Sequence, residues 1–349
     1  MKDVTVHPDI TIRQAMKALN KTAEKCLLVV DKNRKLLGTL TDGDLRRSIL
    51  AGAQFSENIS KSFYTKPTIL IRSKFSPEEA KRLLRVKMLD LIPVVDENRV
   101  VVDYVTWARL GDEISPKRLL TDVPVVIMAG GKGTRMEPFT KVLPKPLVPI
   151  REKPIIEHII KRFTDIGCTD FHMTVNYKGK ILKAYFEELQ PDYLLHFVEE
   201  KEPLGTAGSL RLLDGKFNQS FFVTNCDIII KTDYLSLYEF HKKGDYDITL
   251  VASAKEYVIP YGTCELNGDG YLSHINEKPK YDFLINTGLY VLNSEVLKHI
   301  PKKKFYHITH LIEDVKNREK RVGVFPIDDD AWVDVGQWAE YKIALDKLQ

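Results

Sequence analysis

The chain has 349 residues, of which 44% are hydrophobic and 29% are charged, and its net charge of +4 is small for this length. Such a composition is typical of a soluble globular protein with room for two domains. No long basic tract is present and no apolar stretch approaches the roughly 20 residues that span a bilayer, so we expect neither a nucleic-acid partner nor a membrane partner.

The N-terminal residues and the cysteines together predict the cellular compartment of the protein. The first eight residues, MKDVTVHP, lack the apolar core of a signal peptide. The cysteines at positions 26, 168, 226 and 264 are scattered and form no C-x-x-C pair. This pattern is typical of reduced thiols, and we expect a cytoplasmic protein.

An internal repeat with an offset of 65 residues occupies the first third of the chain. The hexapeptide VVDKNR at 29–34 recurs as VVDENR at 94–99, and Thr41 recurs as Thr106. Each copy predicts an amphipathic helix (10–22 and 75–87), a strand that ends at the Val-Val pair, a turn, a second strand and a helix. Because neither copy can bury much core alone, we expect the two to pack together as one α+β domain.

The segment after the first Val-Val pair resembles the ligand-binding element of CBS domains, G-x-[LIV]-[ST]-x-x-D-[LIV]-R, from Gly38 to Arg46. A tandem pair of such domains is a Bateman module. The resemblance implies that Thr41 contacts the phosphate of a regulatory purine nucleotide and that Asp44 accepts hydrogen bonds from its ribose. A carboxylate suits this role because it accepts two hydrogen bonds at once.

The second copy departs from this pattern, since Asp103 replaces Gly38 and Arg109 replaces Asp44. We therefore expect one nucleotide site in each chain. The alternative is a purely structural module. Paired Bateman modules commonly dimerise, so the resemblance implies a homodimer.

The chain changes character after residue 110. We assign residues 1–112 to the tandem CBS regulatory module, 113–122 to a polar, turn-prone linker and 123–349 to a catalytic domain. Beyond the linker, apolar strands alternate with helices, which predicts an α/β fold with a mostly parallel sheet. The expected strands are 123–128, 171–175, 194–198, 220–225 and 248–252, and the expected helices are 155–166, 180–188, 207–213 and 235–242.

A glycine-rich segment, GGKGTRMEPFTKVLPKPLVP at 130–149, follows the first of these strands directly. Its glycines let the backbone approach a ligand and turn amide groups toward phosphate oxygens, and the nearby cations offset charge on a phosphorus centre under attack. A Walker loop requires Gly-Lys-Ser/Thr, but Gly133 is followed by Thr-Arg. The dinucleotide fingerprint requires a third glycine where Met136 stands.

The segment resembles the motif GGxGTRxxP-x-T-x₄-PKP of sugar-phosphate nucleotidyltransferases. This resemblance implies a Rossmann-like, glycosyltransferase-A-like domain with a mixed, mostly parallel sheet. Arg135 then contacts the triphosphate, and Lys145 contacts the α-phosphate and the leaving group. The implied nucleotide-binding residues of the loop are Gly130, Gly131, Gly133 and Thr134.

Two carboxylates stand at positions suited to a divalent cation, and Mg²⁺ is the expected cofactor because nucleophile and triphosphate are both anions. Asp227 ends the apolar strand in VTNCD, which resembles the family's V-x-N-G-D apart from Cys226. Asp334 lies in WVDVG, which resembles W-x-D-[IV]-G. The resemblance implies that Asp227 and Asp334 are the metal ligands and that Asp227 also acts in catalysis.

Three shorter elements follow in family order. LGTAG at 204–208 resembles the segment beside the nucleotide base and ribose, with Gly205, Thr206 and Gly208 as implied contacts. EKP at 277–279 and NTG at 286–288 resemble sugar-binding elements. The implied sugar-phosphate contacts are Glu277, Lys278, Asn286, Thr287 and Gly288.

The expected reaction is attack by a sugar 1-phosphate on the α-phosphorus of a nucleoside triphosphate, with release of pyrophosphate. The order of domains and the motif variants are similar to those of the glucosamine-1-phosphate guanylyltransferases of legionaminic acid biosynthesis. This similarity implies GTP and glucosamine 1-phosphate as substrates. The alternatives are a mannose-1-phosphate guanylyltransferase, a uridylyl- or thymidylyltransferase, and a nucleotide-sensing regulator with an inactive transferase fold.

Overall fold

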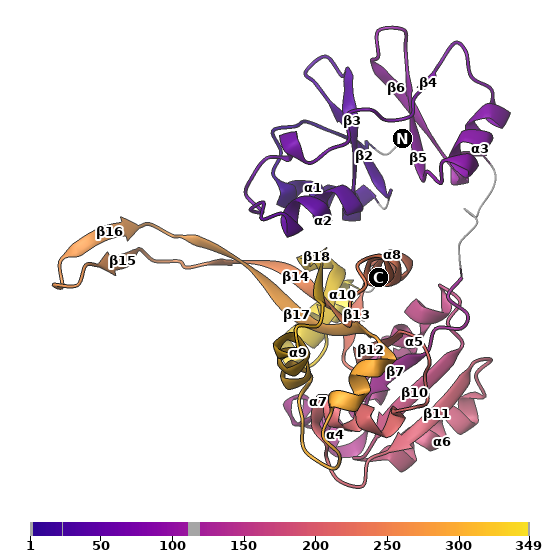
Figure 1. Cartoon of the computed structure of the whole chain (residues 1–349), viewed down its shortest axis with the longest axis vertical. Helices are drawn as coiled ribbons and strands as arrows, with labels where there is room; N and C mark the ends of the chain where they lie inside the picture. Colours follow the sequence, from indigo (N-terminus) through magenta and orange to yellow (C-terminus); the bar gives the residue numbers. More distant parts are fainter. Residues whose placement is uncertain (1–2, 23, 111–118, 348–349) are drawn as a thin grey trace. The chain divides into compact units, whose positions relative to one another are not determined.

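A computed structural model describes residues 3–22, 24–110 and 119–347 of the chain. It contains two compact units, one of residues 1–117 with 255–283 and one of residues 118–254 with 284–349 (Figure 1). Most of the predicted linker, residues 113–118, lies outside the described residues. Among the described helices, none is both long enough and apolar enough to cross a membrane.

The first unit holds the repeat as two three-stranded sheets, ordered β1-β2-β3 and β4-β5-β6. Equivalent strands of the two copies start 65 residues apart, as the sequence repeat predicts. The first copy comprises β1 (Thr5–Val6), α1 (Ile12–Thr22), β2 (Cys26–Val30), β3 (Leu36–Thr41), α2 (Asp42–Leu50) and the 3₁₀ turn η1 (Ile59–Lys61). The second comprises β4 (Leu70–Ile71), α3 (Pro77–Val86), β5 (Leu91–Val95), β6 (Val101–Thr106) and η2 (Ala108–Leu110).

Reciprocal hydrogen bonds join the two copies. The amide of Leu36 donates to the carbonyl of Arg99 over 2.9 Å, and the amide of Val101 donates to the carbonyl of Arg34 over 3.0 Å. The two bonds are related by the same 65-residue offset. One buried cluster contains side chains of β2 and β3 from the first copy and of β5 and β6 from the second. The prediction that the copies share a core is therefore confirmed.

The two copies differ at their ends. The first continues from β3 into the nine-residue helix α2, whose first turn is capped by Thr41. The second continues from β6 into η2, and residues 111–118 lie outside the described residues. The helix predicted after the second strand of this copy therefore falls partly on residues without a description.

A seven-stranded sheet with order β11-β10-β7-β12-β17-β14-β18 forms the centre of the second unit. The neighbours β11, β10, β7 and β12 are parallel, β14 is parallel to β18, and β17 is antiparallel to β12. The expected mostly parallel α/β fold is thus confirmed. The sheet strands are β7 (Val125–Met128), β10 (Asp170–Val175), β11 (Leu194–Glu199), β12 (Phe221–Asn225), β14 (Ile248–Val258), β17 (Lys280–Leu292) and β18 (Val322–Asp328).

Helices and short elements complete this unit. The helices are α4 (Phe139–Val142), α5 (Ile155–Thr164), α6 (Gly179–Leu189), α7 (Gly205–Gly208), α8 (Tyr234–Lys243), α9 (Ile308–Asn317) and α10 (Trp338–Lys347). The 3₁₀ turns are η3 (Thr134–Met136), η4 (Lys145–Leu147), η5 (Ser209–Leu213), η6 (Ser294–His299) and η7 (Asp329–Ala331). Short strands form two pairs, β8 (Pro149–Ile150) with β9 (Lys153–Pro154) and β13 (Ile228–Ile230) with β19 (Trp332–Asp334).

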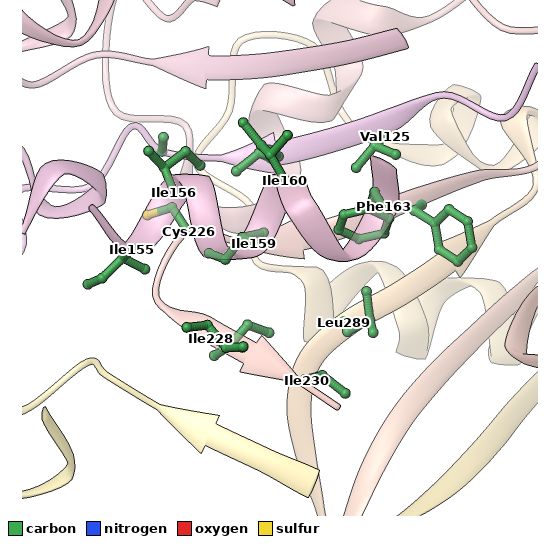
Figure 2. Packing of buried hydrophobic residues seen from close by; sticks show 14 of the residues in the cluster. Val125, Ile155, Ile156, Ile159, Ile160, Phe163, Cys226, Ile228, Ile230 and Leu289 are labelled. Carbon is green, nitrogen blue, oxygen red and sulfur yellow. The ribbon is translucent and has the colours of Figure 1, made fainter. Parts of the chain in front are cut away.

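Helix α5 supplies much of the core on one face of the sheet (Figure 2). Its apolar residues recur at helical spacing, and Ile155, Ile156, Ile159, Ile160 and Phe163 are all buried. The Phe163 ring lies 5.3 Å from the Phe222 ring of β12 and 4.8 Å from the Tyr234 ring of α8. These contacts fix the central strands, and therefore also the loops that leave their carboxyl ends.

Strands β15 (Thr263–Leu266) and β16 (Leu272–Asn276) form a separate antiparallel ribbon at the end of a long arm (Figure 1). Nearly every side chain of the ribbon is exposed. This arm, residues 255–283, belongs to the first compact unit.

Candidate active site

The glycine-rich turn begins where the fully buried strand β7 ends. Gly133 has a φ of 68°, the left-handed region that favours glycine, and its carbonyl accepts a hydrogen bond from Thr140 Oγ1 over 2.9 Å. A Cβ at Gly133 would lie 2.9 Å from the Thr140 side chain. Gly131, Thr134 and Arg135 are exposed beside it. Backbone groups of the turn and the Arg135 guanidinium are therefore accessible to a ligand from solvent.

Glu200 packs against Gly130 of the glycine-rich turn. This residue was not predicted from the sequence. A Cβ at Gly130 would lie 2.4 Å from its Oε1, while its Oε2 accepts a hydrogen bond from the amide of Leu204 over 3.1 Å. Burial raises the pKa of Glu200, against the hydrogen bond from the amide of Leu204. The available signal was weak, namely an acidic residue directly after the parallel strand β11.

Lys145 is buried, which is unusual for a lysine. The Pro144-Lys145-Pro146 sequence sets it in η4, and its Nζ lies 2.5 Å from Asp227 Oδ2 and 3.4 Å from the carbonyl of Gly336. A buried ammonium requires such partners. The ion pair therefore aims the cation at the carboxyl end of β12, 82 residues away in the sequence.

The antiparallel pairing of β13 with β19 brings Asp227 and Asp334 together. Ile228 lies opposite Asp334, and the amide of Val335 donates to the carbonyl of Asp227 over 2.9 Å. Burial chiefly raises the pKa of Asp334, and the nearby Asp227 charge adds to this rise. The amide of Gly336 opposes it with a 2.7 Å hydrogen bond to Asp334 Oδ1.

One point beside Gly336 shows how closely these groups meet. A Cβ built there would lie 2.8 Å from Asp334 Oδ1, 3.1 Å from Asp227 Oδ2 and 3.3 Å from Lys145 Nζ. Two carboxylates and one ammonium thus surround a position that only glycine leaves open. Gly336 is a further residue of the site, recognised from the sequence only as part of WVDVG.

The carboxylate pair fits a divalent cation. Two carboxylates held close repel each other, and the Asp227 charge adds to the rise that burial causes in the pKa of Asp334. A bound cation would relieve that repulsion. Cys226, the departure from the family motif, does not join them: its thiol is buried in the core, and burial raises its pKa to about 12. The oxygens of Asp227 and Asp334 are therefore the donors that a hard cation would use.

The predicted base-binding segment is packed against residues 304–308. Gly205 has a φ of 78°, and a Cβ there would lie 2.7 Å from the carbonyl of Tyr306. The Thr206 hydroxyl accepts a hydrogen bond from the amide of Ile308, and the amide of Gly208 donates to Tyr306 over 3.1 Å. These polar groups are occupied within the protein, so close backbone approach is what this segment can offer to a ligand.

The predicted sugar-binding residues fall in two places. Asn286, Thr287 and Gly288 lie on β17, where Thr287 Oγ1 donates to the carbonyl of Val251 over 2.9 Å. Glu277 and Lys278 are exposed on the arm of the first unit. The cluster of Lys145 and the two aspartates does not include them.

The two residues predicted for a regulatory nucleotide bind each other. The amide and hydroxyl of Thr41 donate to Asp44 Oδ2 over 2.8 and 2.6 Å, forming a capping box at the start of α2. In the second copy Arg109 donates to Asp103 Oδ1 over 2.6 Å and lies 3.8 Å from the Tyr104 ring. The two residues that depart from the CBS pattern thus form an ion pair with each other.

Two protein families match the chain. The CBS domain family matches residues 1–51, which is the first copy of the repeat. The nucleotidyl transferase family matches residues 124–349, well over half of the chain.

Curated relatives match over the same region. Mannose-1-phosphate guanyltransferase 2 of Candida glabrata is 36% identical over 222 residues, or 61% of this chain and 61% of that protein. Mannose-1-phosphate guanyltransferase of Saccharomyces cerevisiae is 35% identical over 222 residues, or 61% of each chain. The chain thus spans about three fifths of the length of these relatives.

Among solved structures, HddC from Yersinia pseudotuberculosis superposes with a TM-score of 0.51 and 26% identity, covering 65% of this chain and all of HddC. The inositol-1-phosphate CTP transferase from T. maritima, 16% identical with a TM-score of 0.50, covers 64% of this chain and 95% of its own, and supports the fold alone. On the family match to residues 124–349, the chain belongs to the nucleotidyl transferase family.

Proposed function

We propose that this protein transfers a guanylyl group from GTP to a hexose 1-phosphate, most specifically glucosamine 1-phosphate, and releases pyrophosphate. The observation that carries this proposal is the meeting of Lys145, Asp227 and Asp334 around Gly336. This cluster lies at the carboxyl end of β12, which is the neighbour of β7, the strand that precedes the glycine-rich turn. Ligands of open α/β sheets bind at this edge.

In the proposed reaction, a phosphate oxygen of the sugar 1-phosphate attacks the α-phosphorus of GTP. A new P–O bond forms, the bond to the β-phosphate oxygen breaks, and pyrophosphate carries the electron pair away. The attacking phosphate is already anionic near neutral pH, so no general base is required. Positioning and charge neutralisation supply the catalysis.

The chain's own residues divide this work. The amides of Gly130, Gly131 and Gly133 face the phosphates, and exposed Arg135 binds the triphosphate. Lys145, held by Asp227, neutralises the α-phosphate. Asp227 and Asp334 would hold Mg²⁺, which when bound supplies charge neutralisation at the reacting phosphates.

Guanine as the base is supported by the names of the curated relatives, which are guanyltransferases. For the sugar, a CBS module ahead of the transferase favours glucosamine 1-phosphate, by resemblance to the enzymes of legionaminic acid biosynthesis. The relatives' names favour mannose 1-phosphate as a second candidate. The two sugars differ at C2, where glucosamine carries an equatorial amine and mannose an axial hydroxyl.

The test is pyrophosphate release with Mg²⁺, for each nucleoside triphosphate against glucosamine, mannose and glucose 1-phosphates. We expect turnover with GTP and glucosamine 1-phosphate, abolished by Asp227→Asn and unchanged by Asp165→Asn, which alters an exposed carboxylate at the end of α5. A different productive pair would keep the reaction class and replace the substrates. Absence of turnover with every pair would overturn the transferase proposal in favour of a nucleotide sensor.

For the N-terminal module, we propose that a purine nucleotide bound at Thr41 and Asp44 changes the transferase rate and that the chain forms a homodimer. The proposal of a single nucleotide site is supported by the Asp103–Arg109 pair in the second copy. With Arg109 at the position equivalent to Asp44, the second copy lacks the acceptor on which the proposed ribose recognition depends.

A further inference from the structure

Three side chains with metal-binding atoms gather at the amino-terminal ends of β10 and β11, away from the residues discussed so far. Asp170 is the first residue of β10, and His172, two positions on, projects from the same face of the strand. His196 of β11 is the direct neighbour of His172 in the parallel register. Because β11 is the edge strand of the sheet, one side of this group is open to solvent.

The ligand atoms of the three residues converge. His172 Nε2 lies 3.1 Å from Asp170 Oδ1, and His196 Nε2 lies 3.7 Å from the same oxygen. One ligand atom from each residue lies within 4.8 Å of the other two. A tetrahedral zinc ion with bonds of about 2.0–2.1 Å separates its ligands by roughly 3.3 Å, and the two distances from the imidazoles to Asp170 Oδ1 are close to this value.

Salt bridges alone do not account for this arrangement. Asp170 Oδ1 is buried and has no hydrogen-bond partner in the described part of the chain, although both imidazoles lie near it. A buried acceptor without a donor is costly.

The two rings are already arranged side by side. The imidazoles of His172 and His196 stack with centroids 4.8 Å apart and planes 26° from parallel, and Phe217 packs edge-on against His172. Ring packing and the strand register thus hold both imidazoles beside Asp170.

We propose that Asp170, His172 and His196 form a binding site for Zn²⁺ or a similar late first-row divalent cation. Two imidazole nitrogens and one carboxylate suit such an ion, whereas Mg²⁺ prefers oxygen ligands. The fourth position would be taken by water from the side of His196, whose side chain is 55% exposed. The ion would join the edge strand β11 to β10.

This site is separate from the proposed catalytic centre. Gly130 follows the carboxyl end of β7, and β7 runs parallel to β10, whose amino-terminal end carries Asp170. The three proposed zinc ligands and the catalytic residues therefore lie toward opposite ends of the parallel strands. A cation at Asp170 would stabilise the sheet without touching the substrates.

The test is calorimetric titration of the full, tag-free chain with Zn²⁺ in excess Mg²⁺, which occupies the Asp227 and Asp334 carboxylates. We expect one Zn²⁺ per chain and a binding constant at least about 100-fold weaker in His196→Ala and in Asp170→Asn. His196 is exposed, so its replacement leaves the fold intact. Bound Co²⁺ should show the intense visible absorption of a tetrahedral site, and these variants should lose it.

His310→Ala is the matched control, since His307 and His310 form another pair of exposed histidines with rings 5.4 Å apart. It should bind Zn²⁺ as the wild type does. Turnover with Mg²⁺ should be unchanged in His196→Ala. The proposal is overturned if the wild type binds no Zn²⁺ under these conditions, or if His196→Ala and Asp170→Asn bind it as tightly as the wild type.

Discussion

At the scale of single residues, we expect replacement of Lys145 to slow the reaction strongly. Replacing it with methionine keeps a similar length and removes the cation beside the α-phosphate. Loss of one preorganised charge typically lowers kcat by about 10²–10³-fold. Steady-state pyrophosphate release should show this fall for Lys145→Met. Lys141→Met, which alters an exposed lysine of the same segment, should retain the wild-type rate; equal losses in the two variants would contradict a specific role for Lys145.

Gly336 allows a second test at this scale. An alanine Cβ there would lie 2.8 Å from Asp334 Oδ1 and 3.3 Å from Lys145 Nζ, so both groups must move by a few tenths of an ångström. Misplacement of this size should lower kcat by about 10- to 100-fold. Thermal unfolding and kcat are measured together for Gly336→Ala and for Gly268→Ala, where a Cβ meets open space. An unchanged kcat in Gly336→Ala would show that the cluster tolerates rearrangement.

At the scale of elements, His241 links helix α8 to two strands. Its Nδ1 lies 2.9 Å from Thr249 Oγ1 on β14, and its Nε2 lies 3.0 Å from Ser220 Oγ just before β12. Burial lowers the pKa of His241 from 6.5 to about 4. The unfolded chain therefore binds a proton that the folded chain does not, between these two pH values.

This difference predicts how stability depends on pH. The contribution of neutral His241 is fully present above pH 6.5 and is lost as the pH falls from 6.5 toward about 4. The maximum loss is about 3 kcal/mol. Urea unfolding from pH 4 to 7 should show a smaller loss on acidification in His241→Gln than in the wild type. His274→Gln, at an exposed position, should keep the wild-type dependence; the same dependence in His241→Gln would refute the assignment.

The elements also show how far sequence reasoning extends. The repeat and the strands β7, β10, β11 and β12 were predicted within a few residues, because periodicity and buried apolar runs are local signals. The predicted helix at 207–213 is instead α7 followed by η5. The predicted elements stop at residue 252, whereas the structure continues through β17, α9, β18 and α10.

The same contrast between local and long-range information applies to the residues of the candidate active site. Motif matches singled out Lys145, Asp227 and Asp334 separately. Their meeting depends on the pairing of β13 with β19, whose residues are about a hundred positions apart, and no local pattern specifies such a pairing. Glu200 escaped prediction for a related reason: its role depends on the distant Gly130 and is visible only once the fold brings them together.

At the scale of the whole molecule, the N-terminal module is expected to regulate the transferase. The measurement is the rate of pyrophosphate release as AMP, GMP or ATP is added. At least one of them should change the rate of the wild type and leave Asp44→Asn unaffected, since the amide presents one acceptor oxygen to the ribose diol where the carboxylate presents two. Arg109→Ala, at the equivalent position of the second copy, should respond as the wild type does. Absence of any response in the wild type would reject this regulatory role.

The carboxylate of Glu200 has a consequence beyond this single chain. It occupies the space that a side chain at position 130 would need, and it also binds the amide of Leu204. Neither residue can therefore change independently during evolution without a steric clash or an unsatisfied amide. Across an alignment of transferases with this turn, positions 130 and 200 are expected to covary, with any side chain larger than glycine at the first accompanied by a residue shorter than glutamate at the second.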